Sequence, residues 1–246
     1  MNFHIKSLCH QGAIRENNED AISYAVHKEL DVMWMLIADG MGGHNAGEVA
    51  SSMLVDQIKY AWGKVSITKQ ASWLTWITEQ LNTANLSILK QAKNTEGQQG
   101  MGTTGVLIVI ENNKCHLGWV GDSRAYTLKN KNLVQETIDH TMLQELVNKG
   151  AISAETAKNA NTKNLLSQAI GVREKISVDT ATIAIENGDT IMLSTDGLHD
   201  YLTEQEINHY LSEFSSKKDV CDDMVNQAIA QNSRDNLTVG LINFSD

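Results

Sequence analysis

The sequence of 246 residues contains no proline and only three cysteines. Without proline, every turn depends on glycine, asparagine, aspartate and serine. The cysteines, Cys9, Cys115 and Cys221, are odd in number and far apart, which argues against a disulfide framework and favours a reducing compartment. No Cys-x-x-Cys motif and no cysteine–histidine cluster is present, so we do not expect a zinc site.

Positive charge and long apolar runs are also scarce. The 20 lysines and arginines stand against 30 aspartates and glutamates, which gives a formal net charge of −10 at pH 7. A nucleic-acid-binding protein needs a basic face, so this balance argues against nucleic acid and anionic lipid as partners. The longest apolar run, residues 32–38, is too short to span a bilayer. No secretion signal is recognisable, and we expect a cytoplasmic protein without membrane contact.

Apolar periodicity divides the chain into short strands and amphipathic helices. Runs typical of strands lie at residues 4–9, 21–27, 32–38, 106–110, 115–120, 124–128, 133–136, 176–185, 190–194 and 237–244. Helical spacing is found at residues 50–61, 74–88, 140–164 and 220–229. Thr203 and Glu206 predict a capping box for a helix over residues 204–213. Because strand runs are mostly adjacent and no linker interrupts them, we expect one α+β domain over residues 1–246, a layered sandwich with antiparallel strands.

Acidic residues stand beside glycine or asparagine at the ends of several apolar strands. They are Glu19 and Asp20, Asp39 before Gly40, Asp122 after Gly121, Asp196 before Gly197, and Asp235 before Asn236. Each pair alone reads as an ordinary turn dipeptide. Several such pairs flanking apolar strands favour a shared site at one edge of a sheet.

Six converging carboxylates would repel one another and raise their own pKa values unless cations were bound between them. Ligands that are all oxygen select hard divalent ions, Mn²⁺ or Mg²⁺, and two or three such ions would offset most or all of this charge. Arg15, four residues before Glu19, is then a candidate for binding phosphate oxygens; the alternative is an ordinary surface arginine.

Six short motifs resemble, in their order, those of metal-dependent PP2C-type protein phosphatases, particularly the bacterial branch. They are Gly12-x-x-Arg15-x-x-Asn18-Glu19-Asp20, Ala38-Asp39-Gly40-Met41-Gly42-Gly43-His44, Gly102-Thr103-Thr104, Gly121-Asp122-Ser123-Arg124-Ala125, Ser194-Thr195-Asp196-Gly197-Leu198 and Arg234-Asp235-Asn236-Leu237-Thr238. The resemblance covers nearly the whole chain. It implies a four-layer αββα sandwich, in which two antiparallel β-sheets are flanked by α-helices.

The resemblance also implies a metal centre. Asp39 would bridge two metal ions, and the Gly40 carbonyl would bind the first. Asp196 and Asp235 would complete the second ion's ligands. Glu19 would act near the metals, largely through water.

Further roles follow from the same resemblance. Asp122 with Asp196 would hold a third, weaker metal ion, and Arg15 would bind the substrate phosphate. Residues 141–165 would form a flap subdomain beside the site that helps to choose substrates. The flap of the family usually carries a His-Pro pair, whereas residues 159–161 of this chain are Asn-Ala-Asn.

The expected function is therefore hydrolysis of phosphoserine and phosphothreonine in proteins by attack of a metal-bridging hydroxide. His44 is the candidate general acid, because histidine titrates in the right range; alternatively it is a loop residue that only hydrogen-bonds a nearby acid. We expect a monomer that reverses a bacterial serine/threonine kinase. The rival interpretations are a catalytically weak PP2C-fold binding module and another two-metal hydrolase, such as a nuclease or nucleotide phosphatase.

Overall fold

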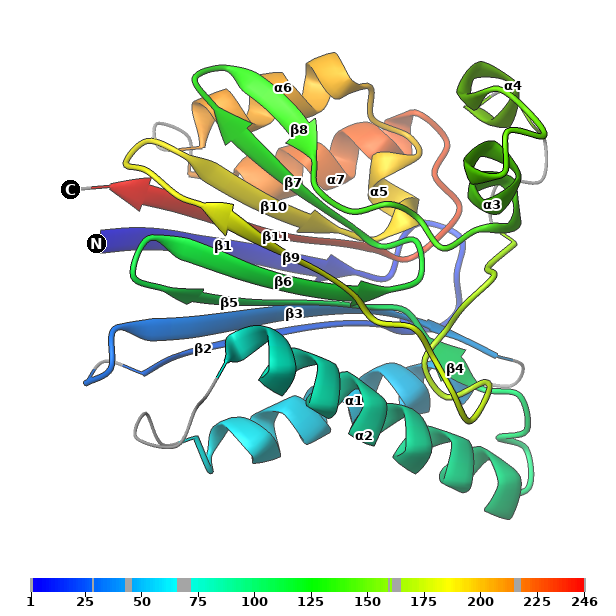
Figure 1. Cartoon of the computed structure of the whole chain (residues 1–246). Coiled ribbons are helices and arrows are strands. Elements are labelled where there is room, and N and C mark those ends of the chain that lie inside the picture. Colours follow the sequence, from blue (N-terminus) through cyan, green and yellow to red (C-terminus); the bar gives the residue numbers. More distant parts are fainter. Residues whose placement is uncertain are drawn as a thin grey trace.

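The computed structural model describes residues 2–27, 29–42, 46–65, 72–158, 160, 165–214 and 218–245. Two antiparallel sheets lie face to face at the centre, and helices cover the outer face of each (Figure 1). This arrangement is the expected four-layer αββα sandwich of the α+β class. None of the described helices has the length and apolarity needed to cross a membrane.

The first sheet joins the two ends of the chain. Its strands, in spatial order, are β1 (Asn2–His10), β11 (Leu237–Ser245), β10 (Thr190–Ser194), β7 (Arg124–Lys129) and β8 (Asn132–Gln135). The second sheet has the order β2 (Asp20–His27), β3 (Val32–Met41), β5 (Gly105–Glu111), β6 (Lys114–Val120) and β9 (Asp179–Ala184), with β4 (Gly102–Thr103) paired to the end of β3.

The helices form the outer layers and one peripheral unit. The second sheet is covered by α1 (Ala46–Trp62) and α2 (Trp73–Asn94), and the first by α6 (Glu204–Glu213) and α7 (Val220–Ala230) (Figure 1). The short helix α5 (Asp196–His199) follows β10 directly. Helices α3 (Met142–Asn148) and α4 (Ala154–Lys158) lie at one end of the sandwich, within the segment predicted to be a flap.

Alternation along β3 shows why four layers form. Trp34 and Leu36 belong to the apolar core shared with α1 and α2, whereas Met33, Met35 and Ile37 pack between the two sheets. Both faces of this strand are therefore buried, as its continuous apolar run predicts. A third core lies between the first sheet and the helices α6 and α7.

The structure refines two sequence expectations. The strand expected at residues 32–38 continues to Met41, because Gly40 and Met41 pair with Thr103 and Gly102 of β4. The hairpins β5–β6 and β7–β8 are antiparallel, as expected, but belong to different sheets. The chain crosses between the sheets at residues 121–123, which brings Asp122 to the end where both sheets meet.

Candidate active site

Carboxylates from distant parts of the sequence gather at one end of the two sheets. They are Glu19, Asp20, Asp39, Asp122, Asp196 and Asp235. Asp39 and Asp20 are direct cross-strand partners in β3 and β2. Asp196 begins α5 immediately after β10, and Asp235 lies just before the neighbouring strand β11. Strand order thus brings the predicted site residues together.

Within this cluster, Asp20 connects the two sheets. Its Oδ2 accepts a hydrogen bond of 2.9 Å from the hydroxyl of Thr195 and one of 2.6 Å from the hydroxyl of Thr238. Thr195 precedes Asp196, and the backbone N–H of Thr238 donates to the Thr195 hydroxyl. The carboxylate of β2 therefore fixes the end of β10 and the start of β11, the two strand ends that carry Asp196 and Asp235.

Burial and mutual repulsion dominate the electrostatics of the cluster. Burial, and then the neighbouring aspartates, raise the pKa of Asp39 and of Asp122 well above the usual value of a carboxyl group. The same causes raise the pKa of Asp20 to about 7 and that of Asp196 to about 6. The aspartates that raise the pKa of Asp39 are Asp20, Asp196, Asp122 and Asp235, which shows how closely these groups interact.

Two consecutive threonines fix the backbone of Asp39. The carbonyl of Asp39 accepts from the Thr104 N–H at 2.8 Å and from the Thr103 hydroxyl at 3.0 Å. The Asp39 N–H donates to the Thr104 hydroxyl, which lies 2.7 Å from the hydroxyl of Ser123. Thr104 thereby links Asp39 to the crossover that carries Asp122. The Gly-Thr-Thr motif was visible in the sequence, but this role was not assigned from it.

Gly40 is required by close approach of other backbone segments. A Cβ atom there would lie 2.2 Å from the Gly47 carbonyl oxygen and 2.5 Å from that of Glu19. The Gly40 N–H donates to the Glu19 carbonyl at 3.0 Å. Burial raises the pKa of the Glu19 carboxyl, an effect opposed by the Gly47 N–H and by Arg15. Glu19 and Gly40 are thus held together at the start of α1, beside Asp39.

Arg15 forms an ion pair with Asp235. Its Nη2 lies 2.8 Å from both carboxylate oxygens of Asp235, and the two side chains are 47% and 34% exposed. Asn236 anchors the loop of Arg15, because its side-chain amide donates to the carbonyls of Gln11 and Asn17 and its oxygen accepts from the Glu19 N–H. The anchoring role of Asn236 was missed, since Asp235-Asn236 also reads as a turn.

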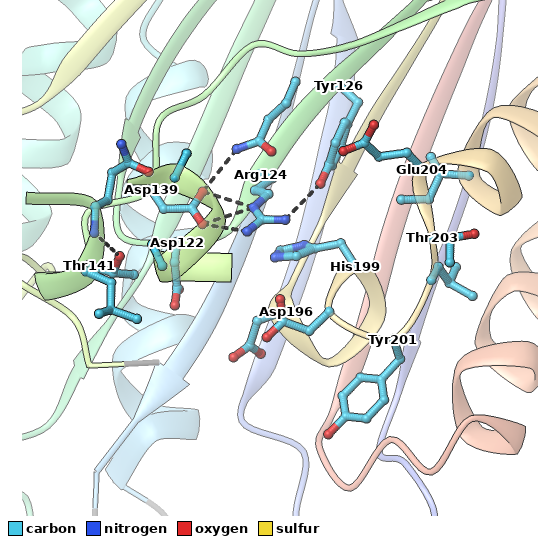
Figure 2. Close-up of a pocket in the computed structure, with 18 of the residues that line it drawn as sticks. Asp122, Arg124, Tyr126, Asp139, Thr141, Asp196, His199, Tyr201, Thr203 and Glu204 are labelled. Carbon is cyan, nitrogen blue, oxygen red and sulfur yellow. Dashed lines mark hydrogen bonds and ion pairs between the residues drawn. The ribbon is translucent and has the colours of Figure 1, made fainter. Parts of the chain in front are cut away.

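A cavity of about 890 Å³ opens beside Asp122 and Asp196 and extends between α3–α4 and α5–α6. Figure 2 shows Arg124 and Asp139 facing each other on its wall, joined by bonds of 2.7 to 3.1 Å. His199 is buried there and bonded to the Ser194 hydroxyl, and burial lowers its pKa well below the usual value. His199 therefore has a neutral packing role.

Two predicted features fall outside the described residues. His44, the candidate acid, is one of them, together with its neighbours 43 and 45. Of the Asn-Ala-Asn segment at 159–161, only Ala160 is described. The roots of the predicted flap are described: the Met142 N–H donates to the Leu165 carbonyl, and the Ser167 N–H donates to the His140 carbonyl.

The donor set fits a hard divalent cation. Across the described ranges, no three His, Cys, Asp or Glu side chains already converge on a point that could hold a metal ion. Such a cage is not required, since Mg²⁺ keeps several waters and uses one or two carboxylates. The clustered donors are oxygens, and a cation between them would relieve the mutual repulsion that adds to burial in raising the pKa values of Asp39 and Asp196.

The fold and the site define an αββα sandwich with a carboxylate-rich centre at the meeting edge of its sheets. Residues 11–237 match the family model described as protein phosphatase 2C. The chain therefore belongs to the protein phosphatase 2C family, which confirms the family expected from the motifs.

Individual relatives agree in length and fold. The serine/threonine phosphatase stp of Listeria welshimeri is 35% identical over 98% of this chain and 95% of its own length. The solved S. agalactiae serine/threonine phosphatase superposes with a TM-score of 0.92 at 29% identity, over 99% of this chain and all of that one. The catalytic domain of the phosphatase PstP, solved in complex with two manganese ions, gives a TM-score of 0.83 at 26% identity, with 99% of each chain covered.

Proposed function

We propose that this protein is a metal-dependent serine/threonine protein phosphatase, which hydrolyses phosphoserine and phosphothreonine in proteins. The observation that carries this proposal is the cluster of mutually repelling, largely buried aspartates around Asp39 at the end of both sheets. The relatives named as serine/threonine phosphatases support the substrate class.

We infer that Mn²⁺ or Mg²⁺ is the cofactor, with two ions in the core. Asp39, the Gly40 carbonyl, Asp196 and Asp235 would hold them, with Glu19 close by. When bound, the cations supply Lewis-acid activation of water and neutralise charge on the phosphoryl oxygens. The two manganese ions bound by the related phosphatase PstP support the count. Asp122 with Asp196 is our proposed site for a third ion.

The chain's own residues bind and orient the substrate. Arg15 is nearly half exposed and presents a planar fork that suits two phosphoryl oxygens. Its partner in the structure, Asp235, is one of the proposed cation ligands. A cation on Asp235 would weaken this ion pair, and Arg15 would then contact the phosphoryl group. The leaving serine or threonine oxygen needs a proton, for which His44 remains the proposed donor.

The large cavity supports a polypeptide substrate. Its volume of about 890 Å³ leaves room beside Asp122 and Asp196 for residues that flank the phosphorylated one. Helices α3 and α4 form one wall, which is consistent with a flap over residues 141–165 that selects substrates within a single domain of 246 residues. We propose a cytoplasmic monomer that opposes a bacterial kinase, without nucleic acid or membrane as partner.

Metal-dependent hydrolysis of a phosphothreonine peptide tests this function. We expect no phosphate release in excess chelator and recovery with Mn²⁺ or Mg²⁺, with slower hydrolysis of a nucleotide and of single-stranded DNA. Full activity in chelator would contradict the metal dependence. Metal binding by calorimetry without any hydrolysis would indicate the catalytically weak binding module instead.

A further inference from the structure

A second, smaller cavity is lined by two acids of the carboxylate cluster, Asp196 and Asp235. Its volume is about 100 Å³, roughly three times the share of one water molecule in the liquid (about 30 Å³). Arg15, Arg234 and Tyr201 line it together with Asp196, Asp200 and Asp235. Figure 2 shows Asp196 and Tyr201 where they also border the larger cavity. A cavity of this size can hold a small anion, but it is too small for a whole amino-acid residue of a substrate.

Arginine is rare in this chain, and half of the arginines line the small cavity. The sequence has four arginines, and two of them meet at this one small cavity from loops far apart in the chain. The guanidinium of Arg124 is already paired with the carboxylate of Asp139. Arg234 is exposed and forms no ion pair within the part of the chain that the structure describes. Its guanidinium is therefore available to a ligand.

The loop that carries Arg234 is fixed on both sides. The buried hydroxyl of Ser233 donates to the Gly197 carbonyl at 2.7 Å, and the Ser233 N–H donates to the Ala228 carbonyl. Asn236, also buried, holds the loop of Arg15 through the Gln11 carbonyl at 2.7 Å. These hydrogen bonds fix the positions of the two loops, and therefore the distance between the backbones of Arg15 and Arg234. An arginine that served only as a solvated surface residue would not require such a fixed backbone.

The residues that line the cavity with Arg234 indicate the chemical class of its ligand. Arg15 is the proposed phosphoryl-binding residue, and Asp196 and Asp235 are proposed cation ligands. Once cations neutralise those two aspartates, two guanidinium groups and one carboxylate, that of Asp200, remain at the cavity, so the charge of its lining favours an anion. Arginine pairs are well suited to phosphate because each planar fork can donate two parallel hydrogen bonds.

We propose that Arg234 is a second phosphoryl-binding residue, which together with Arg15 grips the non-bridging oxygens of the phosphoryl group that is hydrolysed. This inference rests on the proposed function, in which Arg15 is the arginine that binds the phosphoryl group. Arg234 then contributes to affinity for the phosphoryl group and for the product phosphate.

The test compares Arg234→Ala, Arg234→Lys and the control Arg173→Ala, whose arginine is exposed and lines neither cavity. With Mn²⁺ bound, we measure the inhibition constant of inorganic phosphate against a small phosphate monoester, and phosphate binding directly by calorimetry. Loss of a charge-assisted hydrogen bond predicts a rise of about tenfold in the inhibition constant and in KM for Arg234→Ala, with kcat little changed. Arg234→Lys should fall between wild type and Arg234→Ala, and Arg173→Ala should match wild type.

Three results would overturn the proposal. One is an inhibition constant for Arg234→Ala equal to that of Arg173→Ala. Another is an effect confined to peptides with an acidic residue beside the phosphothreonine, which would assign Arg234 to a flanking side chain. The third is a phosphate effect that vanishes at saturating Mn²⁺, which would mean that only metal affinity had changed. A wild type that binds phosphate but hydrolyses no phosphopeptide would instead refute the proposed function, and the calorimetric comparison would still decide the role of Arg234.

Discussion

The two sides of the carboxylate cluster are built differently. The inner side, defined as Asp20, Asp39 and Asp122, lies on strands or at the crossover between sheets, and Asp20 and Asp122 are each only 8% exposed. The outer side, defined as Arg15, Arg234 and Asp235, lies on loops. In its ion pair, the side chain of Arg15 is 47% exposed and that of Asp235 is 34% exposed. Burial raises the pKa values of the inner acids, whereas the outer side carries both signs of charge.

The difference in burial between the two sides corresponds to two different roles, positioning of the oxygen donors and binding of the phosphoryl group. On the inner side, threonine hydroxyls and backbone amides hold the oxygen donors in place, so their geometry is part of the fold. On the outer side, an exposed ion pair contributes only about 0–1 kcal/mol, so Arg15 can exchange Asp235 for a phosphoryl group at little cost. We therefore expect inner substitutions to affect metal binding and stability, and substitutions of the outer arginines to affect substrate affinity.

The largest effect is expected from Asp39→Asn. Altering partners that merely orient a metal ligand costs about 10–100-fold in affinity or activity, so loss of the proposed bridging carboxylate should lower kcat by more than about a hundredfold. Asp235→Asn should also nearly abolish turnover, because Asp235 belongs to both the metal centre and the outer side. Phosphopeptide hydrolysis under saturating Mn²⁺ checks this, with Asp56→Asn on the exposed face of α1 as control. Wild-type kcat in either variant would refute the ligand assignment.

The second prediction concerns pH and stability without metal. Because the pKa is raised to about 7 at Asp20 and to about 6 at Asp196, the folded metal-free protein binds protons more tightly than the unfolded chain. The stability contributed by protonation is complete below about pH 4 and is lost as the pH rises through 6 to 7. In excess chelator, the free energy of unfolding of wild type should therefore fall over this range relative to Asp20→Asn.

Added Mn²⁺ should reverse this trend, because a cation favours the ionised carboxylates. The stabilisation by Mn²⁺, measured as a shift in Tm, should increase from pH 5 to pH 7. A Mn²⁺ effect that is independent of pH, or a chelator curve that is identical for wild type and Asp20→Asn, would contradict the electrostatic account of the inner side.

The same division explains what the sequence could reveal. Local signals were reliable: Thr203 and Glu206 form the predicted capping box, and the helix spans Glu204–Glu213 as expected. The four-residue helix α5 was not predicted, because it is too short to show periodicity. Strand-end acids were recognisable because glycine or asparagine beside them interrupts apolar runs.

Contacts between residues far apart in the sequence could not be predicted from such local signals. Thr238 and Asp20 are 218 residues apart, and Thr104 and Asp39 are 65 apart, so nothing near either threonine indicates its partner. The pairing of Arg15 with Asp235 was missed for the same reason. The family motifs indicated which acids lie together at this end of the sheets, but the hydroxyl and amide groups that hold them could be identified only from the fold.

Thr238→Val should reveal the cost of loosening the inner side. The substitution keeps the shape of the side chain but removes the 2.6 Å hydrogen bond to the buried carboxylate of Asp20. Leaving that acceptor short of a partner should lower the free energy of unfolding by about 1–3 kcal/mol. Urea denaturation measures this, and Thr180→Val on an exposed position of β9 is the control. Equal stability of the two variants would show that Asp20 does not depend on the hydroxyl of Thr238.

The smallest effect is expected on the outer side, from Arg15→Lys and Arg15→Ala. The exposed ion pair with Asp235 adds little to folding, so both variants should unfold at nearly the wild-type urea concentration. Loss of the guanidinium in Arg15→Ala should raise KM for a phosphopeptide about tenfold, whereas Arg15→Lys keeps the charge without the fork and should raise it less. Steady-state kinetics separates KM from kcat. Unchanged values of both in Arg15→Ala would remove Arg15 from the phosphoryl site, and a loss of stability instead would mean that the outer side, like the inner one, serves the fold.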